Sequence, residues 1–307
     1  MNLFVLSVGE TIYSTKRLID EAENRGHNVK VINHTKCLVK LGAGKPQVSY
    51  DGEDIIDIPQ AIIPRIGSSV GAHGSAVVKE FEMNGVFSTA HSLGILRAQN
   101  KVRTLQIMNR KHIPIPQTVF SINPNNINEQ IELLGGPPVV IKLQEGTQGL
   151  GVILAESKKS ARSIIDTFYN MNASIMLQEF ISESNGEDIR IIVVGNKVIA
   201  AMKRMGELDD FRSNIHRGGV GIKIELTSRE KNIALRAAQY LGLPVAGVDI
   251  IRSEKGPLLI EVNGSPGLQG IEAFTKVNVA GEIIKFIERS VYKINNKENT
   301  ARFNKKT

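Results

Sequence analysis

Cysteine and long hydrophobic runs are scarce in this chain. Cys37 is the single cysteine, which excludes an internal disulfide framework and any cysteine-based zinc cluster. A reducing compartment, the cytoplasm, is therefore the expected location. No apolar run approaches the roughly 20 residues that cross a bilayer, so no membrane partner is expected. The first residues lack a basic leader and are expected to form a strand rather than a secretory signal.

Two common catalytic signatures are also missing. The chain contains neither a Gly-x-x-x-x-Gly-Lys-Ser/Thr phosphate loop nor a Gly-x-Ser-x-Gly nucleophile elbow. What is present is an ordinary globular composition, with 41% hydrophobic and 22% charged residues in a chain of 307. That composition excludes a mainly disordered chain, a collagen-like repeat and a coiled coil. At about 100–200 residues per domain, two or three compact units are expected.

The positive charge of the chain is concentrated at its end. The formal net charge is +7, and from Arg289 onward six lysines and arginines stand against one acid, Glu298. We interpret 291–307 as a basic, disordered and solvated tail. Nucleic acid is therefore not an expected partner, except for weak attachment of this tail to ribosomes or RNA through counterion release.

The first domain, placed at 1–95, is expected to be an α/β unit. A strand at Leu3–Ser7, a helix capped by Ser14 or Thr15, and a strand at Asn28–Ile32 predict a parallel, doubly wound sheet.

The remainder predicts an α+β domain at 96–290. Strand, helix, strand, glycine turn, strand, helix and strand follow one another, and this compact lid subdomain spans about 113–180. A C-terminal subdomain at about 181–290 contains a hairpin around Gly195-Asn196 and a last helix at Val279–Val291.

A glycine-rich turn joins two strands of the expected lid. It runs Lys142-Leu143-Gln144-Glu145-Gly146-Thr147-Gln148-Gly149-Leu150-Gly151. Such a turn lets backbone N–H groups approach phosphate oxygens without Cβ clashes, and Lys142 can add a positive charge. A flexible hairpin without a ligand is the alternative, and from these residues alone both interpretations stay open.

Three oxygen-bearing side chains lie on two apolar strands near the C-terminus. Asp249 belongs to the strand expected at Ala246–Arg252, and Glu261 and Asn263 belong to the strand expected at Pro257–Asn263. Glu261 and Asn263 are two residues apart and point to one face, and pairing around a short turn can bring Asp249 to it. Carboxylate and amide oxygens suit Mg²⁺ bound together with nucleotide phosphates, which we favour over a salt-bridged strand end.

A polar loop after the hairpin is rich in arginine. Arg212-Ser213-Asn214-Ile215-His216-Arg217-Gly218-Gly219 follows Arg190 and Arg204, which lie on expected strands. Arginine suits planar, bidentate recognition of carboxylate or phosphate. On its own, however, the loop is more typical of a surface segment with scattered charges.

Taken in order, these motifs resemble the ATP-grasp superfamily and, more closely, its RimK family of α-L-glutamate ligases. The resemblance covers the chain to about residue 290. It rests on Ile63-Pro64-Arg65-Ile66-Gly67, Lys101, the turn after Lys142, Gln178-Glu179-Phe180, Asp188-Ile189-Arg190, Asp210-Phe211-Arg212-Ser213-Asn214, Ala246-Gly247-Val248-Asp249-Ile250 and Glu261-Val262-Asn263-Gly264.

The resemblance implies a fold and a set of site residues. The fold would be an N-terminal pre-ATP-grasp α/β domain followed by two α+β units that clamp ATP. Side chains acting in catalysis would be Arg190, Arg212, Asn214 and Arg217, and two Mg²⁺ or Mn²⁺ ions would be bound by Asp249, Glu261 and Asn263. The nucleotide would be bound by Lys101, Lys142, Gly146, Gly149, Gly151, Glu179, Phe180, Ile181, Asp188, Arg212, Ser213 and Asn214.

The resemblance also implies an activity, an ATP-dependent ligation of a carboxylate to an amine through an acyl phosphate. The amine would come from L-glutamate, and the acceptor would be the C-terminus of ribosomal protein S-six or oligoglutamate. A homo-oligomer is expected from the same resemblance. Two alternatives remain: a ligase for a small-molecule acceptor, such as a cofactor tail or a carrier in amino-acid biosynthesis, and a nucleotide-binding module without turnover.

Overall fold

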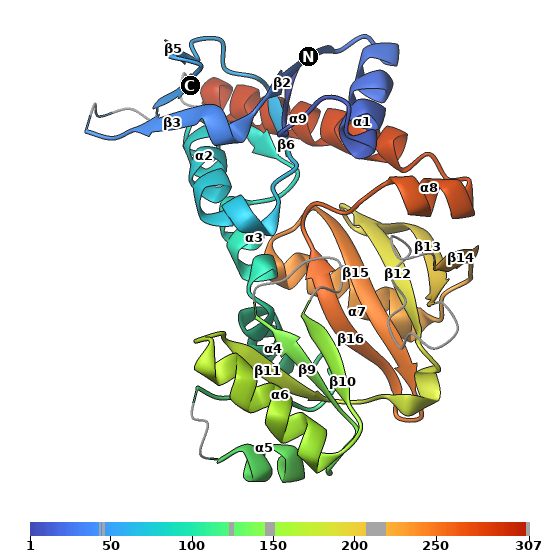
Figure 1. The fold of residues 1–307 in the computed structure, drawn as a ribbon. Helices are drawn as coiled ribbons and strands as arrows, with labels where there is room; N and C mark the ends of the chain where they lie inside the picture. Colours follow the sequence, from blue (N-terminus) through green and yellow to red (C-terminus); the bar gives the residue numbers. More distant parts are fainter. Residues whose placement is uncertain (43, 45–46, 123–125, 145–150, 207–218, 305–307) are drawn as a thin grey trace.

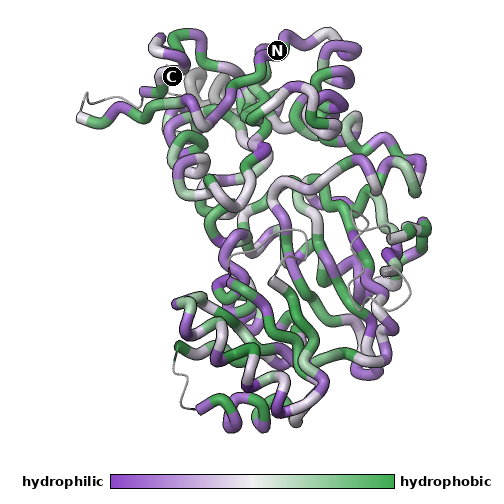
Figure 2. The backbone as a smooth tube through the Cα atoms, viewed as in Figure 1, coloured by the Kyte–Doolittle hydropathy of each residue, from purple (hydrophilic) through white to green (hydrophobic). Residues whose placement is uncertain are grey.

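The computed structural model describes residues 1–42, 44, 47–122, 126–144, 151–206 and 219–304, with 297–304 as backbone only. Figure 1 shows a first unit at the top, a small sheet with two helices at the lower left, and a larger sheet at the right. Hydrophobic stretches run along the strands of these sheets (Figure 2). No helix in the described part of the chain combines the length and the hydropathy needed to cross a membrane.

The first unit is built around a parallel sheet, as the strand–helix–strand start predicted. Its strands stand in the order β2-β1-β6-β7, and every pair is parallel. Buried residues follow one another along β1, the pattern of a parallel sheet that is covered on both faces. The elements are β1 (Asn2–Leu6), α1 (Tyr13–Asn24), β2 (Asn28–Ile32), β6 (Ala61–Pro64), α2 (Gly71–Met83) and β7 (Phe87–Ser88).

A second, antiparallel sheet inserted between β2 and β6 was not predicted. It consists of β3 (Cys37–Lys40), β4 (Gln47–Tyr50) and β5 (Glu53–Asp54). Two helices, α3 (Ser92–Gln99) and α4 (Lys101–Arg110), then connect the first unit to the rest of the chain.

The start of α1 differs from the prediction that Ser14 or Thr15 caps it. The helix begins at Tyr13 behind Ile12, whose side chain makes no cap hydrogen bond. Both predicted caps are buried inside the helix and bond elsewhere: Ser14 Oγ accepts from Leu268 N at 2.9 Å, and Thr15 Oγ1 lies 2.8 Å from Ser7 Oγ. Buried hydroxyls need partners, and here the partners are tertiary rather than helical.

The lid subdomain is a four-stranded antiparallel sheet with its own core. Strands stand in the order β10-β9-β11-β8. Two helices cover the sheet and share a core with it that includes Ile131, Ile141, Ile165 and Leu177. The elements are β8 (Thr118–Phe120), α5 (Ile127–Leu133), β9 (Val139–Leu143), β10 (Val152–Ala155), α6 (Lys158–Asn170) and β11 (Ile175–Glu179).

The C-terminal subdomain is a five-stranded antiparallel sheet in the order β14-β13-β12-β15-β16. The predicted hairpin is formed by β12 and β13, and Gly195 in its turn has a φ of +62°. Helix α7 covers one face, where Ile191, Val248 and Ile250 are buried. The elements are β12 (Glu187–Val194), β13 (Lys197–Met205), β14 (Val220–Lys223), α7 (Ser228–Leu241), β15 (Val245–Ser253), β16 (Gly256–Asn263) and α8 (Gln269–Thr275).

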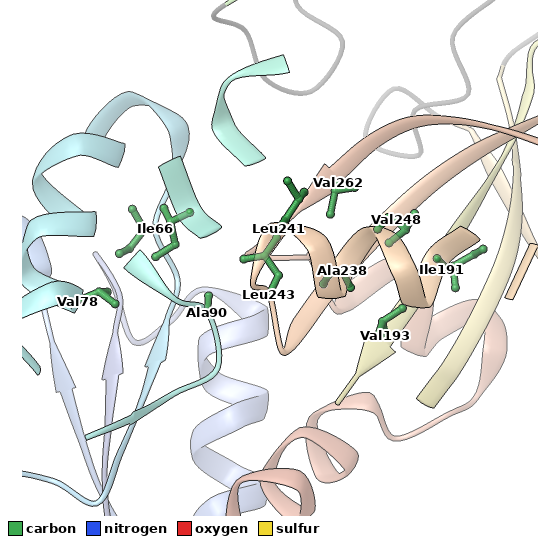
Figure 3. Packing of buried hydrophobic residues seen from close by; sticks show 14 of the residues in the cluster. Ile66, Val78, Ala90, Ile191, Val193, Ala238, Leu241, Leu243, Val248 and Val262 are labelled. Carbon is green, nitrogen blue, oxygen red and sulfur yellow. The ribbon is translucent and has the colours of Figure 1, made fainter. Parts of the chain in front are cut away.

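The first unit and the C-terminal sheet share their cores. Figure 3 shows Ile66 and Ala90 of the first unit in one buried cluster with Leu241, Leu243 and Val262. Helix α3 approaches the end of α7 so closely that a Cβ on Gly94 would lie 2.6 Å from the Gly242 carbonyl oxygen. These two parts therefore pack as one body.

The last helix corrects the predicted end of the chain. α9 runs from Val279 to Asn304, whereas the sequence suggested an end at Val291 and a disordered tail. Residues 292–304 continue the helix, and they include no glycine or proline that would end it. α9 lies beside α1 (Figure 1), and Ile283 and Ile287 are buried with Leu3 of the first unit.

Candidate active site

Charged side chains gather on one face of the C-terminal sheet. Asp249 on β15 stands directly opposite Glu261 on β16 and opposite Arg190 on β12. The shared face of Asp249 and Glu261 is thus as predicted. Asp188 stands opposite Arg204 on β13, and it shares the face of Arg190 because the two are two residues apart.

Asp249 is held between two arginines. It is 6% exposed, and both of its carboxylate oxygens accept hydrogen bonds. Arg190 binds it in a bidentate manner, with Nη2 at 2.6 Å from Oδ2, and Arg204 Nη2 lies 2.8 Å from the same oxygen. Burial raises the pKa of Asp249, but the two guanidinium groups outweigh burial and its pKa lies below the ordinary value.

Arg204 also binds Asp188, with Nε at 2.6 Å from Oδ1 and Nη2 on Oδ2. Burial lowers the pKa of Arg204, but Asp249 and Asp188 more than offset it and the pKa is raised. Sequence reasoning did not place Arg204 among the site residues. The hairpin turn alone could not have revealed it. Continuing the register of Val194 and Lys197 would place Lys203 opposite Asp188, and a bulge between Ile192 and Val193 shifts the pairing by one residue so that Arg204 stands there.

Two lysines face this polar surface from the lid side. Lys142 Nζ on β9 donates to Gln178 Oε1 at 2.6 Å, and Gln178 Nε2 donates to Thr118 Oγ1 at 2.9 Å. Lys101, at the start of α4, donates from Nζ to the Gln144 carbonyl at 3.3 Å. Burial lowers the pKa of Lys142 to about 8, Glu261 opposes this shift, and Lys101 adds to it. Lys142 therefore lies within electrostatic reach of both Lys101 and Glu261.

The three predicted metal ligands differ in their burial and in their hydrogen bonds. Glu261 is exposed and makes no hydrogen bond to a described residue, whereas Asn263 Oδ1 accepts from Ser265 N at 2.8 Å. Within the described ranges, no cluster of three or more His, Cys, Asp or Glu side chains is placed to hold a metal ion. The predicted set, however, contains two carboxylates and one amide. Its oxygens fit Mg²⁺ chemically, provided that Asp249 exchanges a guanidinium for the ion.

The segment predicted to meet adenine lies where the lid joins the C-terminal sheet. Glu179 ends β11, and its backbone N–H donates to the Gln117 carbonyl at 2.9 Å. Its carboxylate accepts from Gln117 N at 2.7 Å. Phe180 is half-buried, and Ile181 is buried with its carbonyl bonded to Ser184. Glu179 is thus hydrogen-bonded, through its backbone and its carboxylate, to Gln117, the residue that precedes β8.

Of the predicted glycine turn, the two ends can be described, residues 142–144 and Gly151. Gly151 has a φ of +74°, a conformation that favours glycine, and its carbonyl accepts from Leu143 N at 2.8 Å. Six predicted site residues lie outside the described residues: Gly146, Gly149, Arg212, Ser213, Asn214 and Arg217.

Comparisons with known proteins agree with this arrangement. The family model described as the RimK-like ATP-grasp domain matches residues 98–287, and the RimK pre-ATP-grasp domain matches residues 1–95. A probable alpha-L-glutamate ligase of Aliivibrio fischeri (strain MJ11) is 50% identical over 290 residues, 94% of this chain and 96% of the relative. One of Vibrio cholerae serotype O1 (strain O395) is 47% identical over the same shares of the two chains.

Solved structures share the fold at lower identity. The ATP-grasp ligase PsnB, complexed with its minimal precursor, aligns with a TM-score of 0.74 at 20% identity, over 94% of this chain and 98% of that one. D-alanine–D-alanine ligase of Bacillus anthracis, complexed with ATP, aligns with a TM-score of 0.69 at 16% identity, over 97% and 99%. With both RimK family models matched in order and relatives half identical over most of their length, the chain belongs to the RimK family of ATP-grasp enzymes, ATP-dependent ligases that form amide bonds.

Proposed function

We propose that this enzyme joins L-glutamate, through its amine, to the C-terminal carboxylate of ribosomal protein S-six or of oligoglutamate. The relatives named as probable alpha-L-glutamate ligases support the amine substrate. One structural observation carries the proposal: Lys142 lies within electrostatic reach of Glu261 and of Lys101, and Glu261 stands opposite the arginine-bound Asp249. Cations and carboxylates at one place are what phosphoryl transfer to a carboxylate needs.

The chemistry requires no side-chain nucleophile. An oxygen of the acceptor carboxylate attacks the γ-phosphorus of ATP, the bond to the bridging oxygen breaks, and ADP leaves. The glutamate amine then attacks the acyl carbon, the bond to the phosphate oxygen breaks, and the amine loses a proton as the amide forms. In this scheme Lys101 and Lys142 hold phosphate oxygens. Arg190 and, beyond the described residues, Arg212, Asn214 and Arg217 stabilise the negative charge of the transferred group.

Further residue roles belong to the same proposal. Gly146, Gly149, Gly151 and Ser213 would bind phosphates through their backbone or hydroxyl groups, Glu179 to Ile181 would meet adenine, and Asp188 would act near the nucleotide. Asp249, Glu261 and Asn263 would hold two Mg²⁺ or Mn²⁺ ions, and these ions, when bound, would neutralise charge on the phosphates. A cytoplasmic location and a homo-oligomer complete the proposal.

Intact mass spectrometry tests the activity and the acceptor together. The purified protein is incubated with ATP, Mg²⁺, L-glutamate and ribosomal protein S-six, with a parallel reaction that lacks the acceptor. Wild-type enzyme should produce a ladder of glutamyl additions, and Glu261→Gln should abolish it. The matched control is Glu282→Gln, which removes an acid of α9 that forms a salt bridge with its helical neighbour Lys285.

The result discriminates between the acceptors. Additions on S-six establish the protein substrate, and free oligoglutamate alone leaves the chemistry standing but removes S-six as acceptor. Unchanged masses with ATP consumed would point to a small-molecule acceptor. Intact ATP in every reaction, or full activity of Glu261→Gln, would contradict the proposal.

A further inference from the structure

A single arginine of the first unit stands at the edge where this unit meets the candidate site. Arg65 directly follows β6, at the carboxyl end of the parallel sheet, and its backbone N–H donates to the Leu6 carbonyl at 2.9 Å. In open parallel sheets, ligands bind outside the carboxyl ends of the strands. The position of Arg65 is therefore a ligand-binding position of the fold.

The loop after β16 fastens Arg65 to the candidate active site. Ser265 Oγ accepts from Ile66 N at 3.2 Å and donates to the Pro64 carbonyl at 3.2 Å, so it bonds on both sides of Arg65. Ser265 lies four positions after Glu261, so their Cα atoms are at most about 14 Å apart. Arg65 is thus held next to the loop that continues from the strand of Glu261, whereas Lys142 approaches Glu261 from the lid.

The same loop comes close to β15 beside Arg190. A Cβ on Gly247 of β15 would meet the Pro266 side chain at 2.9 Å and the Arg190 side chain at 3.6 Å, so both side chains flank this glycine. The loop that bonds on both sides of Arg65 therefore reaches the strand next to Arg190. Ile66, which follows Arg65, is buried in the core shared by both units (Figure 3).

The Arg65 guanidinium has no counter-ion among the described residues. It is half-buried, and no carboxylate in the described part of the chain bonds to it or forms an ion pair with it. Burial alone lowers its pKa to about 10, so the group remains charged at neutral pH. Arg190 and Arg204, by contrast, are both paired with acids. A partly buried and unpaired charge destabilises a fold, which indicates an anion supplied from outside.

We infer that Arg65 binds a substrate carboxylate other than the one that is activated. This inference rests on the proposed function, in which both substrates carry more carboxylates than the reaction consumes. L-Glutamate brings an α- and a γ-carboxylate, and a glutamyl acceptor brings a γ-carboxylate beside its reacting terminus. A guanidinium fits each of them through two parallel hydrogen bonds. In the proposed function the ATP phosphates already have Lys101, Lys142, Arg190 and the metal ions as partners, so we assign Arg65 to a substrate carboxylate instead.

Steady-state kinetics of Arg65→Met, Arg65→Lys and wild-type enzyme test the inference with Mg²⁺ and ATP present. In Arg65→Met, KM for either L-glutamate or the acceptor should rise about 10–100-fold, the effect of losing a charge-assisted hydrogen bond. KM for ATP should stay within about twofold, and Arg65→Lys should recover part of the loss because it keeps the charge. Arg25→Met is the matched control, since Arg25 belongs to the same unit and pairs with Glu288 far from the site.

Substrate analogues identify which carboxylate is bound. L-Glutamine lacks the γ-carboxylate of the amine substrate, L-glutamic acid α-amide lacks its α-carboxylate, and a glutamine-terminated acceptor lacks the γ-carboxylate of the acceptor. Wild-type enzyme should discriminate against the analogue that lacks the carboxylate bound by Arg65. Arg65→Met should lose that discrimination for one analogue only. A purely structural role of Arg65 would change the stability or kcat but not the preference between a carboxylate and its amide. If Arg65→Met fails to fold by circular dichroism, Arg65→Lys and Arg65→Gln replace it.

A binding measurement separates this inference from the activity. Ligand-observed NMR follows L-glutamate and the acceptor with the enzyme, Mg²⁺ and a non-hydrolysable ATP analogue. If Arg65→Met no longer binds one of these two substrates, the inference is supported. It is supported even if wild-type enzyme forms no amide, and in that case only the proposed function fails. Ligation by the wild type with unchanged KM values and unchanged analogue preference in Arg65→Met overturns the inference and leaves the function intact. If neither substrate binds to wild-type enzyme, both are overturned.

Discussion

Lys142 is a residue whose proposed function requires a charge that its burial destabilises. Its ammonium is half-buried, and burial lowers its pKa to about 8, so the charged form is disfavoured by the fold although it predominates at pH 7. The neutral amide of Gln178 is the hydrogen-bond partner that the described structure gives it. A bound phosphate anion would stabilise the charged form of Lys142, which a neutral amide does not. We therefore propose that Lys142 binds the nucleotide.

Replacing Lys142 by methionine should therefore separate activity from stability. KM for ATP should rise about 10–100-fold, because a charge-assisted hydrogen bond to phosphate is lost. At pH 7 the free energy of unfolding should rise by roughly 1–2 kcal/mol, because the charge whose burial lowers the pKa is removed. Kinetics and denaturant unfolding measure the two effects.

The control for this pair of measurements is Lys158→Met. Lys158 belongs to the same lid but is exposed and pairs with Glu132 at the surface, so neither quantity should change. A Lys142→Met protein that is less stable than wild type, with unchanged KM for ATP, would show that Lys142 is structural.

At the scale of the element, α7 shows local signals that agree with the fold. Thr227 Oγ1 accepts from Glu230 N, and the Glu230 carboxylate accepts from Thr227 N at 2.8 Å, a reciprocal cap. Arg252 of β15 also donates to Glu230, which is 2% exposed. Burial raises the pKa of Glu230, but Arg252 and Thr227 outweigh it and the pKa is lowered.

Glu230→Gln should thus destabilise the protein in a pH-dependent way. Because the pKa is lowered in the folded state, the contribution of the carboxylate is complete above the ordinary value of 4.5 and is lost as the pH falls through the lower folded value. At pH 7 the variant should lose about 1–2 kcal/mol of unfolding free energy, and the difference from wild type should shrink towards pH 3. Urea unfolding at both pH values measures it, with exposed Glu225→Gln as the control that should match wild type. A difference that is constant with pH would contradict the carboxylate's role.

Elements were predictable where the signal is local. The β-branched run of β9 and the apolar face of α7 were found in sequence because period and composition agree there with the final packing. Ser14 and Thr15 misled because they have the chemistry of caps but bond to Leu268 and Ser7. The sheet β3–β5 was missed because its strands are only two to four residues long, too short for a periodicity to be recognised.

The same division holds for the site at the scale of the whole molecule. The short turn made it foreseeable that the strands of Asp249 and Glu261 pair. Their register was not foreseeable, because a bulge between Asp249 and Ile250 shifts the pairing by one residue and puts Asp249 opposite Glu261 rather than Ile260. Nor was the placement of Arg65 beside Ser265, because the two are 200 positions apart and only tertiary packing brings them together. Bulges and sequence distance, rather than residue chemistry, therefore limit what could be predicted of this site.

The first unit and the C-terminal sheet share one buried core, and we therefore expect them to unfold together. A Cβ at Gly94 would lie 2.6 Å from the Gly242 carbonyl oxygen and 2.9 Å from that of Leu241, and backbone atoms cannot turn aside as a side chain can. Gly94→Ala should therefore force α3 away from α7 and cost about 1–3 kcal/mol in the main unfolding transition. Gly267→Ala, with nothing within 4 Å of its Cβ and no positive φ, is the control and should leave this transition unchanged.

Hydrogen exchange of Gly94→Ala should show weakened protection in both the first unit and the C-terminal sheet, and unchanged protection in the lid, whose core is separate. Weakened protection confined to the first unit would mean that the shared core does not couple the two parts.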